Sequence, residues 1–181
     1  MQIKNKAIFL DRDGVINVEV NYLSDPRDLK LIEGTIEALK TLKEKGYLLI
    51  IITNQSAIAR GYFDERTLEK IHGKLKKILK KSNIEIDDIY YCPHHPDFTG
   101  ECDCRKPHPG MIFKARDKFN IDLQQSYMVG DTLKDIEAGK NAGCKTVLVL
   151  TGYGIEERNK IKEIKPDFIF QNLLEFAKNL K

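Results

Sequence analysis

The sequence predicts an α/β fold in which helices cover both faces of a mostly parallel, doubly wound sheet, a Rossmann-like arrangement. The first observation is that short apolar runs alternate with longer amphipathic segments along the 181 residues. The second is that the short runs are apolar at successive positions, as strands buried on both faces are. The third is the absence of a repeat or a Gly/Ser linker, so we expect one domain over residues 1–181.

The apolar runs indicate five strands, each expected to be covered on both faces. They are Ala7 to Leu10, Leu48 to Ile52, Tyr127 to Val129, Thr146 to Leu150 and Phe168 to Phe170.

Helices are expected between these strands. The first spans about Ile32 to Lys45 and ends at Gly46. The second follows Asp64, a plausible N-cap, and further helices are expected after Pro109, after Leu133 and near the C-terminus. In the second helix an apolar stripe accounts for the helix, so its lysines are expected to face solvent and His72 to be structural. The stripe is Leu68, Ile71, Leu75, Ile78 and Leu79, and the lysines are Lys74, Lys76, Lys77, Lys80 and Lys81.

Composition limits the classes of partner. Thirty basic and twenty-seven acidic residues leave a net charge of +3, which gives no reason to expect a nucleic acid or a membrane as partner. The opening MQIKNKAIFLDRDG has four consecutive apolar positions, too few for a secretory signal or a membrane span. We therefore expect a cytoplasmic, monomeric protein that acts on a small anionic substrate.

Acidic side chains follow two of the predicted strands. In extended backbone Asp11 and Asp13 share one side while Arg12 points away, and Asp131 follows another strand with Asp135 nearby. Ligands of a doubly wound sheet bind outside the carboxyl ends of its strands, so these groups should meet there. Clustered carboxylates need a cation, and an oxygen-only ligand set suits Mg²⁺.

A phosphate group fits the same crevice. Its charge would oppose a carboxylate ~4 Å away by about 4 kcal/mol per pair of unit charges at an effective dielectric near 20, so further positive charge is needed. Lys106, with Arg105 beside it, supplies that charge, and the Thr53 hydroxyl can donate to phosphoryl oxygens. Taken singly the aspartates could be turn or helix caps, but their joint occurrence at strand ends favours a site.

Three cysteines lie close together beside histidines. Cys92 and His94 form a C-x-H pair, and Cys102 and Cys104 form a C-x-C pair a short loop later. Three thiolates and one imidazole suit a closed, structural Zn²⁺ site, although either His94 or His95 could reach, and reduced cysteines packed in a loop are the alternative. We expect Cys144, which stands apart, to be a small buried apolar residue and leave His95 and His108 unassigned.

The motifs DRDGV at 11–15, TN at 53–54, Lys106 and GDTLKD at 130–135 resemble, in order, the four motifs of the haloacid dehalogenase (HAD) superfamily. The resemblance implies that Asp11 attacks phosphorus to form an aspartyl-phosphate and that Asp13 is the general acid and base. It also implies Mg²⁺ ligation by Asp11, the Asp13 backbone carbonyl and Asp131, with phosphoryl binding by Thr53 and Lys106.

Longer segments narrow this resemblance. TNQSAIARGYF, YYCPHHP and CDCRKPHPGM look like the capless, zinc-loop heptose-bisphosphate phosphatases and are also similar to the histidinol-phosphate phosphatases. NYL and SAIARG depart from the usual pattern, which leaves the sugar and its anomer open. The resemblance implies zinc ligation by Cys92, His94, Cys102 and Cys104. The implied substrate-binding residues are Glu19, Val20, Asn21, Tyr22, Asn54, Gln55, Ser56, Arg105 and Thr132.

A hypothesis of a different class is a non-catalytic, zinc-stapled module. It would bind phosphorylated or nucleic-acid partners through the lysines from Lys74 to Lys81.

Overall fold

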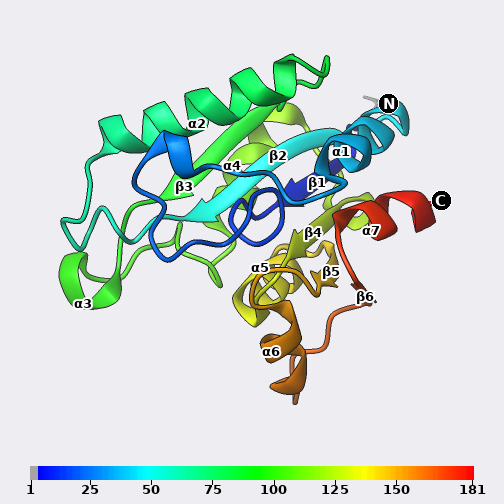
Figure 1. The fold of residues 1–181 in the computed structure, drawn as a ribbon. Coiled ribbons are helices and arrows are strands. Elements are labelled where there is room, and N and C mark those ends of the chain that lie inside the picture. The colour runs from blue at the N-terminus through cyan, green and yellow to red at the C-terminus, as the bar shows by residue number, and fades with distance from the viewer. Residues whose placement is uncertain (1–3) are drawn as a thin grey trace.

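The computed structural model describes residues 4–181, so the first three residues of the expected 1–181 domain lie outside the described part. Within residues 4–181 the strands form one parallel, six-stranded sheet in the order β3-β2-β1-β4-β5-β6, with helices on both faces (Figure 1). The strands are β1 (Ala7–Leu10), β2 (Leu48–Asn54), β3 (Asp88–Cys92), β4 (Tyr127–Gly130), β5 (Lys145–Val149) and β6 (Phe168–Phe170). The helices are α1 (Thr35–Glu44), α2 (Glu65–Lys80), α3 (Pro96–Thr99), α4 (Gly110–Phe119), α5 (Leu133–Ala142), α6 (Gly154–Asn159) and α7 (Leu173–Asn179). The α/β prediction is confirmed.

Two hydrophobic clusters explain why β1 is apolar at every position and β2 is apolar from Leu48 to Ile52. Side chains alternate between the two faces of a strand, so Ile8 and Leu10 of β1 join one cluster while Ala7 and Phe9 join the other. The first cluster contains buried residues of α1, α2 and α7, and the second contains those of α4 and α5. The central sheet is therefore buried on both sides.

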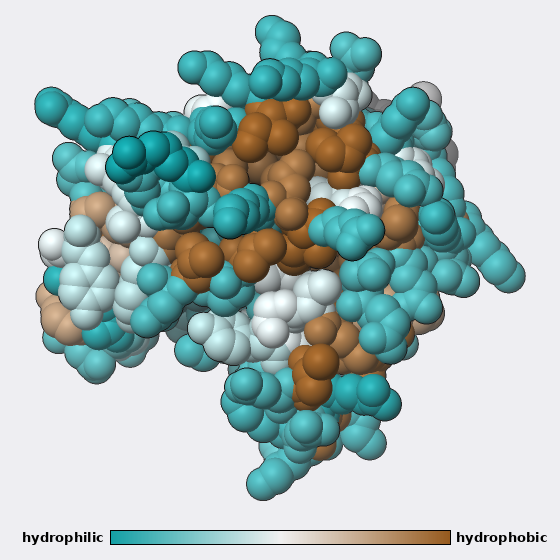
Figure 2. All heavy atoms as spheres, viewed as in Figure 1, coloured by the Kyte–Doolittle hydropathy of each residue, from teal (hydrophilic) through white to brown (hydrophobic). Residues whose placement is uncertain are grey.

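Helix α2 follows the predicted amphipathic pattern. Asp64 is its N-cap, and Oδ1 accepts a hydrogen bond from the Thr67 backbone N–H at 2.9 Å. All five lysines from Lys74 to Lys81 are exposed, while the apolar stripe faces the sheet. Figure 2 shows hydrophilic side chains along the top of the view, where α2 lies, with hydrophobic side chains gathered beneath.

Helix α1 begins later than predicted, at Thr35 instead of Ile32. Gly34 precedes it with φ of +81°, a left-handed conformation that an α-helix cannot include, and the Thr35 N–H closes a turn onto the Ile32 carbonyl. The chain before Gly34 is therefore a turn.

The prediction for the two outer strands needs correction. The sequence pattern does not indicate β3, a short strand of Asp88 to Cys92 whose last residue is also a predicted zinc ligand. It also expected β6 to be covered on both faces, yet Phe168 and Ile169 are exposed because β6 is the edge strand of the sheet. Edge strands lack a neighbour on one side, so apolarity does not guarantee burial there.

The strand order reverses between β1 and β4, the position where ligands of such sheets bind. Asp11 follows β1 and Asp131 follows β4. The connection from β1 to α1, residues 11–34, holds only a 3-10 turn at Pro26–Asp28 among its described elements, which matches the capless prediction. In the described part of the chain, no helix has the length and apolar character that crossing a membrane requires.

Candidate active site

A cavity of about 270 Å³ opens at the carboxyl ends of β1, β2 and β4. It collects all the residues predicted for phosphoryl chemistry and substrate contact, together with both further aspartates. These residues are Asp11, Asp13, Glu19, Val20, Asn21, Tyr22, Thr53, Asn54, Gln55, Ser56, Arg105, Lys106, Asp131, Thr132 and Asp135.

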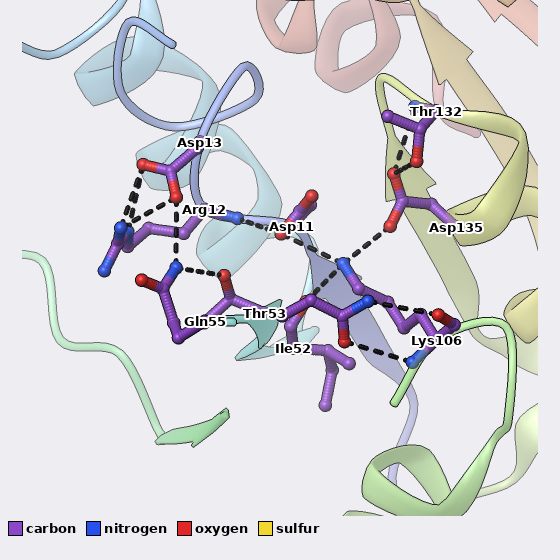
Figure 3. A network of polar contacts seen from close by, with 10 residues as sticks. Asp11, Arg12, Asp13, Ile52, Thr53, Gln55, Lys106, Thr132 and Asp135 are labelled. Carbon is purple, nitrogen blue, oxygen red and sulfur yellow. Dashed lines mark hydrogen bonds and ion pairs between the residues drawn. The ribbon is translucent and has the colours of Figure 1, made fainter. Parts of the chain in front are cut away.

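Lys106 is the buried centre of the site. Its ammonium nitrogen lies 3.0 Å from Oδ1 of Asp11 and 2.6 Å from Oδ1 of Asp135, and it donates to the Ile52 carbonyl at 2.8 Å (Figure 3). Burial alone would lower the pKa of Lys106, but the charges of Asp11 and Asp135 outweigh it and raise that pKa. Lys106 is therefore a fixed positive charge beside the proposed nucleophile.

The side chain of Asn54 holds the loop that carries this lysine. Its Oδ1 accepts from the Lys106 backbone N–H at 3.0 Å, and its Nδ2 donates to the Lys106 carbonyl at 3.1 Å. Asn54 is the last residue of β2, so the sheet sets the position of the loop.

Three carboxylates form a candidate metal centre. One oxygen each from Asp11, Asp131 and Asp135 lies within 4.8 Å of the others. Burial, then repulsion from neighbouring carboxylates, raises the pKa of Asp131 to about 9, and burial raises that of Asp11 to about 7 despite the opposing charge of Lys106. Crowded carboxylates of this kind disfavour their own ionisation, and a hard divalent cation relieves that cost, so the donor set fits Mg²⁺.

Two glycines make room for Asp131. A Cβ on Gly14 or on Gly152 would lie 2.1 Å from Oδ2 of Asp131, and both residues have positive φ. The same oxygen accepts from the Tyr153 backbone N–H at 2.9 Å. The loops after β1 and β5 thus enclose this carboxylate through their backbones.

Asp135 has two functions in the structure. Its Oδ2 accepts from the backbone N–H of Thr132 at 3.0 Å and from the Thr132 hydroxyl at 2.7 Å, which forms the capping box of α5 (Figure 3). Its Oδ1 faces Lys106. Helix capping therefore fixes a carboxylate beside the lysine that is predicted to bind phosphate, and the predicted substrate contact Thr132 has its hydroxyl directed to Asp135.

Asp13 is bound on both carboxylate oxygens. Arg12 donates to Oδ2 at 2.7 Å and to Oδ1 at 3.0 Å, Asn17 donates to Oδ1 at 2.8 Å, and Gln55 donates to Oδ2 at 3.1 Å (Figure 3). Burial would raise the pKa of Asp13, but the Arg12 guanidinium and these hydrogen bonds outweigh it and lower that pKa. Arg12 itself does not line the cavity, as predicted, but sequence analysis missed its pairing with Asp13.

The three clustered cysteines converge next to this site. Their sulfur atoms lie 2.9 Å (Cys92–Cys104), 3.4 Å (Cys102–Cys104) and 3.6 Å (Cys92–Cys102) apart. Sulfur ligands of tetrahedral zinc, at about 2.3 Å from the metal, lie roughly 3.8 Å apart, so the cluster is consistent with zinc after a small expansion. Cys144 is separate and buried in the second apolar cluster, where burial raises its pKa to about 12, as the prediction of an apolar role requires.

The histidines near the cysteine cluster differ in their surroundings. His95 lies 3.1 Å from Nη2 of Arg60 through Nε2, and its ring packs edge-on against Phe98. His94 lies outside the three-sulfur group, so its ligand role stays a prediction. His108 is exposed.

Four residues that line the cavity were not predicted from the sequence: Leu23, Ala57, Lys134 and Tyr153. Lys134 lies inside the GDTLKD motif, so its position could have been inferred from the motif. Tyr153 follows β5, a strand whose end had no polar signal before the structure placed it beside Asp131.

Comparison with known proteins agrees with this geometry. Residues 103–176 match the family model described as "HAD-hyrolase-like". The chain is 44% identical to the D-glycero-beta-D-manno-heptose-1,7-bisphosphate 7-phosphatase of Pasteurella multocida, with 97% of both chains covered. It is 46% identical to the protein of the same name from Haemophilus ducreyi, over 95% of this chain and 96% of that one.

A solved structure is similar along the whole fold. The D,D-heptose 1,7-bisphosphate phosphatase of B. bronchiseptica, complexed with magnesium and phosphate, superimposes with a TM-score of 0.89. It is 35% identical, and the match covers 97% of each chain.

Proposed function

The chain belongs to the heptose-1,7-bisphosphate 7-phosphatases of the HAD superfamily, and from this premise we propose that Asp11 removes the 7-phosphate of D-glycero-beta-D-manno-heptose 1,7-bisphosphate through an aspartyl-phosphate. The beta anomer is the one in the names of the relatives. The observation that carries the proposal is the ammonium of Lys106 between Asp11 and Asp135 at the reversal point of the sheet. That arrangement supplies a nucleophile and the positive charge that a transferring phosphoryl group requires.

The first step transfers the phosphoryl group to the enzyme. A carboxylate oxygen of Asp11 attacks phosphorus, and the bond between phosphorus and the C7 oxygen breaks. Asp13 gives its proton to that oxygen, which leaves as an alcohol. Lys106 and the Thr53 hydroxyl bind the phosphoryl oxygens as their charge redistributes.

The second step returns Asp11 to its starting state. Asp13, now ionised, takes a proton from a water molecule that attacks the phosphorus of the aspartyl-phosphate. The bond between phosphorus and Asp11 breaks, which releases inorganic phosphate and regenerates both carboxyl groups. The contacts from Arg12, Asn17 and Gln55 favour the ionised form of Asp13 that this step needs. In the first step Asp13 must instead carry a proton, which these contacts oppose and which the approach of the phosphate dianion favours.

Two metals accompany this chemistry in the proposal. Asp11, Asp131 and the backbone carbonyl of Asp13 would hold Mg²⁺, with Asp135 nearby, and the ion would offset charge repulsion between phosphate and carboxylate. Cys92, His94, Cys102 and Cys104 would hold a structural Zn²⁺. The loop that bears the cysteines continues directly into Arg105 and Lys106.

The second phosphate of the sugar also needs a counter-charge. Arg105 and Lys134 both line the active-site cavity and a smaller cavity of about 180 Å³ beside it. In the proposal these two cations bind the phosphate on C1 while the 7-phosphate lies against Lys106. A monophosphate would give these two cations no second phosphate to bind.

The cellular setting is part of the proposal. The enzyme acts as a cytoplasmic monomer in heptose biosynthesis for surface lipopolysaccharide, with the small sugar bisphosphate as substrate and neither nucleic acid nor membrane as partner. Clustered cysteines of this spacing suit metal ligation in a reducing compartment.

Turnover of defined substrates tests the proposal. Purified protein with Mg²⁺ is assayed for phosphate release from the beta and alpha anomers of the heptose 1,7-bisphosphate and from histidinol phosphate. We expect the largest kcat/KM for the beta bisphosphate. Protein carrying Asp11→Asn, purified in the same way, excludes a contaminating phosphatase. Faster turnover of histidinol phosphate than of either bisphosphate would contradict the proposed substrate.

A further inference from the structure

His72 is a buried histidine outside the cavity that none of the steps above uses. It lies on α2 within the face that packs on the sheet, and its exposed fraction is 8%. Its Nε2 lies 3.2 Å from Nη1 of Arg12, whose side chain is also buried. Arg12 in turn holds both oxygens of Asp13 through Nη2.

The direction of the contact between His72 and Arg12 follows from the chemistry of the two groups. A guanidinium only donates hydrogen bonds, so Nε2 of His72 must accept and the ring must be the neutral tautomer with its proton on Nδ1. Burial, then the positive charge of Arg12, lowers the pKa of His72 to about 3, which agrees with a neutral ring. His72 therefore accepts a hydrogen bond from Nη1 of Arg12, whereas Asp13 accepts from Nε and Nη2.

This hydrogen bond restricts the guanidinium. Arg12 is almost fully buried, and a buried donor without an acceptor is costly. With Nη1 held by His72, the Nε and Nη2 edge of the planar group faces Asp13, where Nε also lies 3.2 Å from Oδ1. Without that acceptor, a rotation of the guanidinium that brings Nη1 to another acceptor would become favourable, and this rotation would move the group away from Asp13.

We propose that His72 is a positioning residue for the reaction: by accepting a hydrogen bond from Arg12, it fixes the guanidinium that orients the carboxyl group of Asp13. The inference rests on the proposed role of Asp13 as general acid and base. It extends that role to α2, where His72 was expected to be structural and the lysines to face solvent. Asn17 and Gln55 also contact Asp13, so loss of the His72 contact should misorient the carboxylate without releasing it.

A pair of variants separates hydrogen-bond acceptance from packing. His72→Gln keeps an acceptor oxygen near the position of Nε2, whereas His72→Leu keeps a similar volume without an acceptor. We expect kcat for the sugar bisphosphate to fall on the order of tenfold in His72→Leu, with KM little changed, and to stay within about threefold of wild type in His72→Gln. Thermal unfolding of both variants reports whether each is folded.

The leaving group provides a readout that a structural role would not produce. Nitrophenolate leaves p-nitrophenyl phosphate without needing a proton, so its release in a single turnover does not require an oriented acid. In His72→Leu this release should stay within about threefold of wild type, while release of the sugar alcohol slows on the order of tenfold. Equal slowing of both releases, or wild-type kcat in His72→Leu, would overturn the inference.

Two further variants keep the outcome decisive. If His72→Leu does not fold, Arg12→Lys takes its place, because it keeps the charge but not the planar set of donors. It must slow release of the sugar alcohol more than release of nitrophenolate. Equal slowing of both would overturn the inference. Asp13→Asn distinguishes the positioning role of His72 from the proposed acid and base role of Asp13. If Asp13→Asn abolishes turnover while His72→Leu does not slow it, only the inference fails. If Asp13→Asn keeps full turnover, the proposed role of Asp13 fails.

Discussion

The ammonium nitrogen of Lys106 lies 3.0 Å from Oδ1 of Asp11; the lysine is buried, whereas the aspartate is partly exposed to the cavity that both residues line. The lysine comes from the loop after the cysteine cluster and the aspartate from the end of β1. The backbone N–H of Arg12 donates to the same carboxylate oxygen at 2.8 Å. The proposed nucleophile is thus oriented before substrate arrives, and its charge depends on a lysine distant in sequence.

Replacing that lysine should shift the pH dependence of the reaction. Burial raises the pKa of Asp11 to about 7, even though the positive charge of Lys106 opposes this rise. In Lys106→Met this opposition is lost, the pKa of Asp11 rises, and the ionised nucleophile persists only at higher pH. We expect the acidic limb of kcat/KM against pH to move up by about one unit and kcat to fall by about 10²-fold or more. An unmoved acidic limb would contradict this electrostatic coupling.

Gly152 should be required for metal binding. A Cβ there would lie 2.1 Å from Oδ2 of Asp131, so Gly152→Ala must displace the carboxylate. We expect Mg²⁺ affinity, measured by titration of activity, to fall on the order of tenfold or more. Gly143→Ala is the matched control, because Gly143 also has positive φ but nothing within 4 Å of the added Cβ. Both variants should lose stability, and only the first should lose affinity for Mg²⁺.

The cysteine cluster should hold about one zinc per chain, as a closed site of this ligand type does. Cys104→Ser removes one of the three sulfur atoms and should lower both zinc content, measured by elemental analysis, and the unfolding temperature. Activity should fall as well, because Arg105 and Lys106 directly follow this residue. Cys144→Ala, which removes a buried thiol outside the three-sulfur group, should leave zinc content unchanged. Equal zinc in wild type and Cys104→Ser would count against the site.

Lys134 should matter for a bisphosphate and not for a monophosphate. It is exposed and lines the cavity together with Arg105, so Lys134→Gln should raise KM for the heptose bisphosphate by about 3- to 10-fold while p-nitrophenyl phosphate keeps its KM. Lys140→Gln controls for loss of a lysine from the same helix, since Lys140 pairs with Asp167 outside the cavity. An equal KM increase for both substrates would show that Lys134 does not recognise the second phosphate.

Much of the site could be predicted from the sequence because its chemistry is concentrated at strand ends. Asp11, Thr53 and Asp131 follow apolar runs that could hardly be anything but buried strands, and parallel strands bring their carboxyl ends together. Lys106 does not follow a strand, so it could be identified only from its motif. The cysteine cluster was predictable from spacing because thiols close together in sequence are confined to a short loop.

The remaining features depend on contacts that a linear pattern does not encode. β3 was missed because the strand has only five residues and ends in a cysteine that suggested a metal-binding loop. Burial of β6 was overpredicted because apolarity does not reveal which strand lies at the edge. The pairing of His72 with Arg12 joins residues sixty positions apart, and Tyr153 reaches the site through a backbone N–H that any residue except proline could supply.

The covalent intermediate is the most direct test of the account. Enzyme mixed with substrate is quenched in acid within a single turnover and reduced with borohydride, which converts an aspartyl-phosphate to homoserine. The product is then analysed by peptide mass spectrometry. We predict homoserine at position 11 in the wild type, absent without substrate and absent in Asp11→Asn. Phosphate release at the normal rate with position 11 unmodified at every quench time, or with the modification on another carboxylate, would contradict the account.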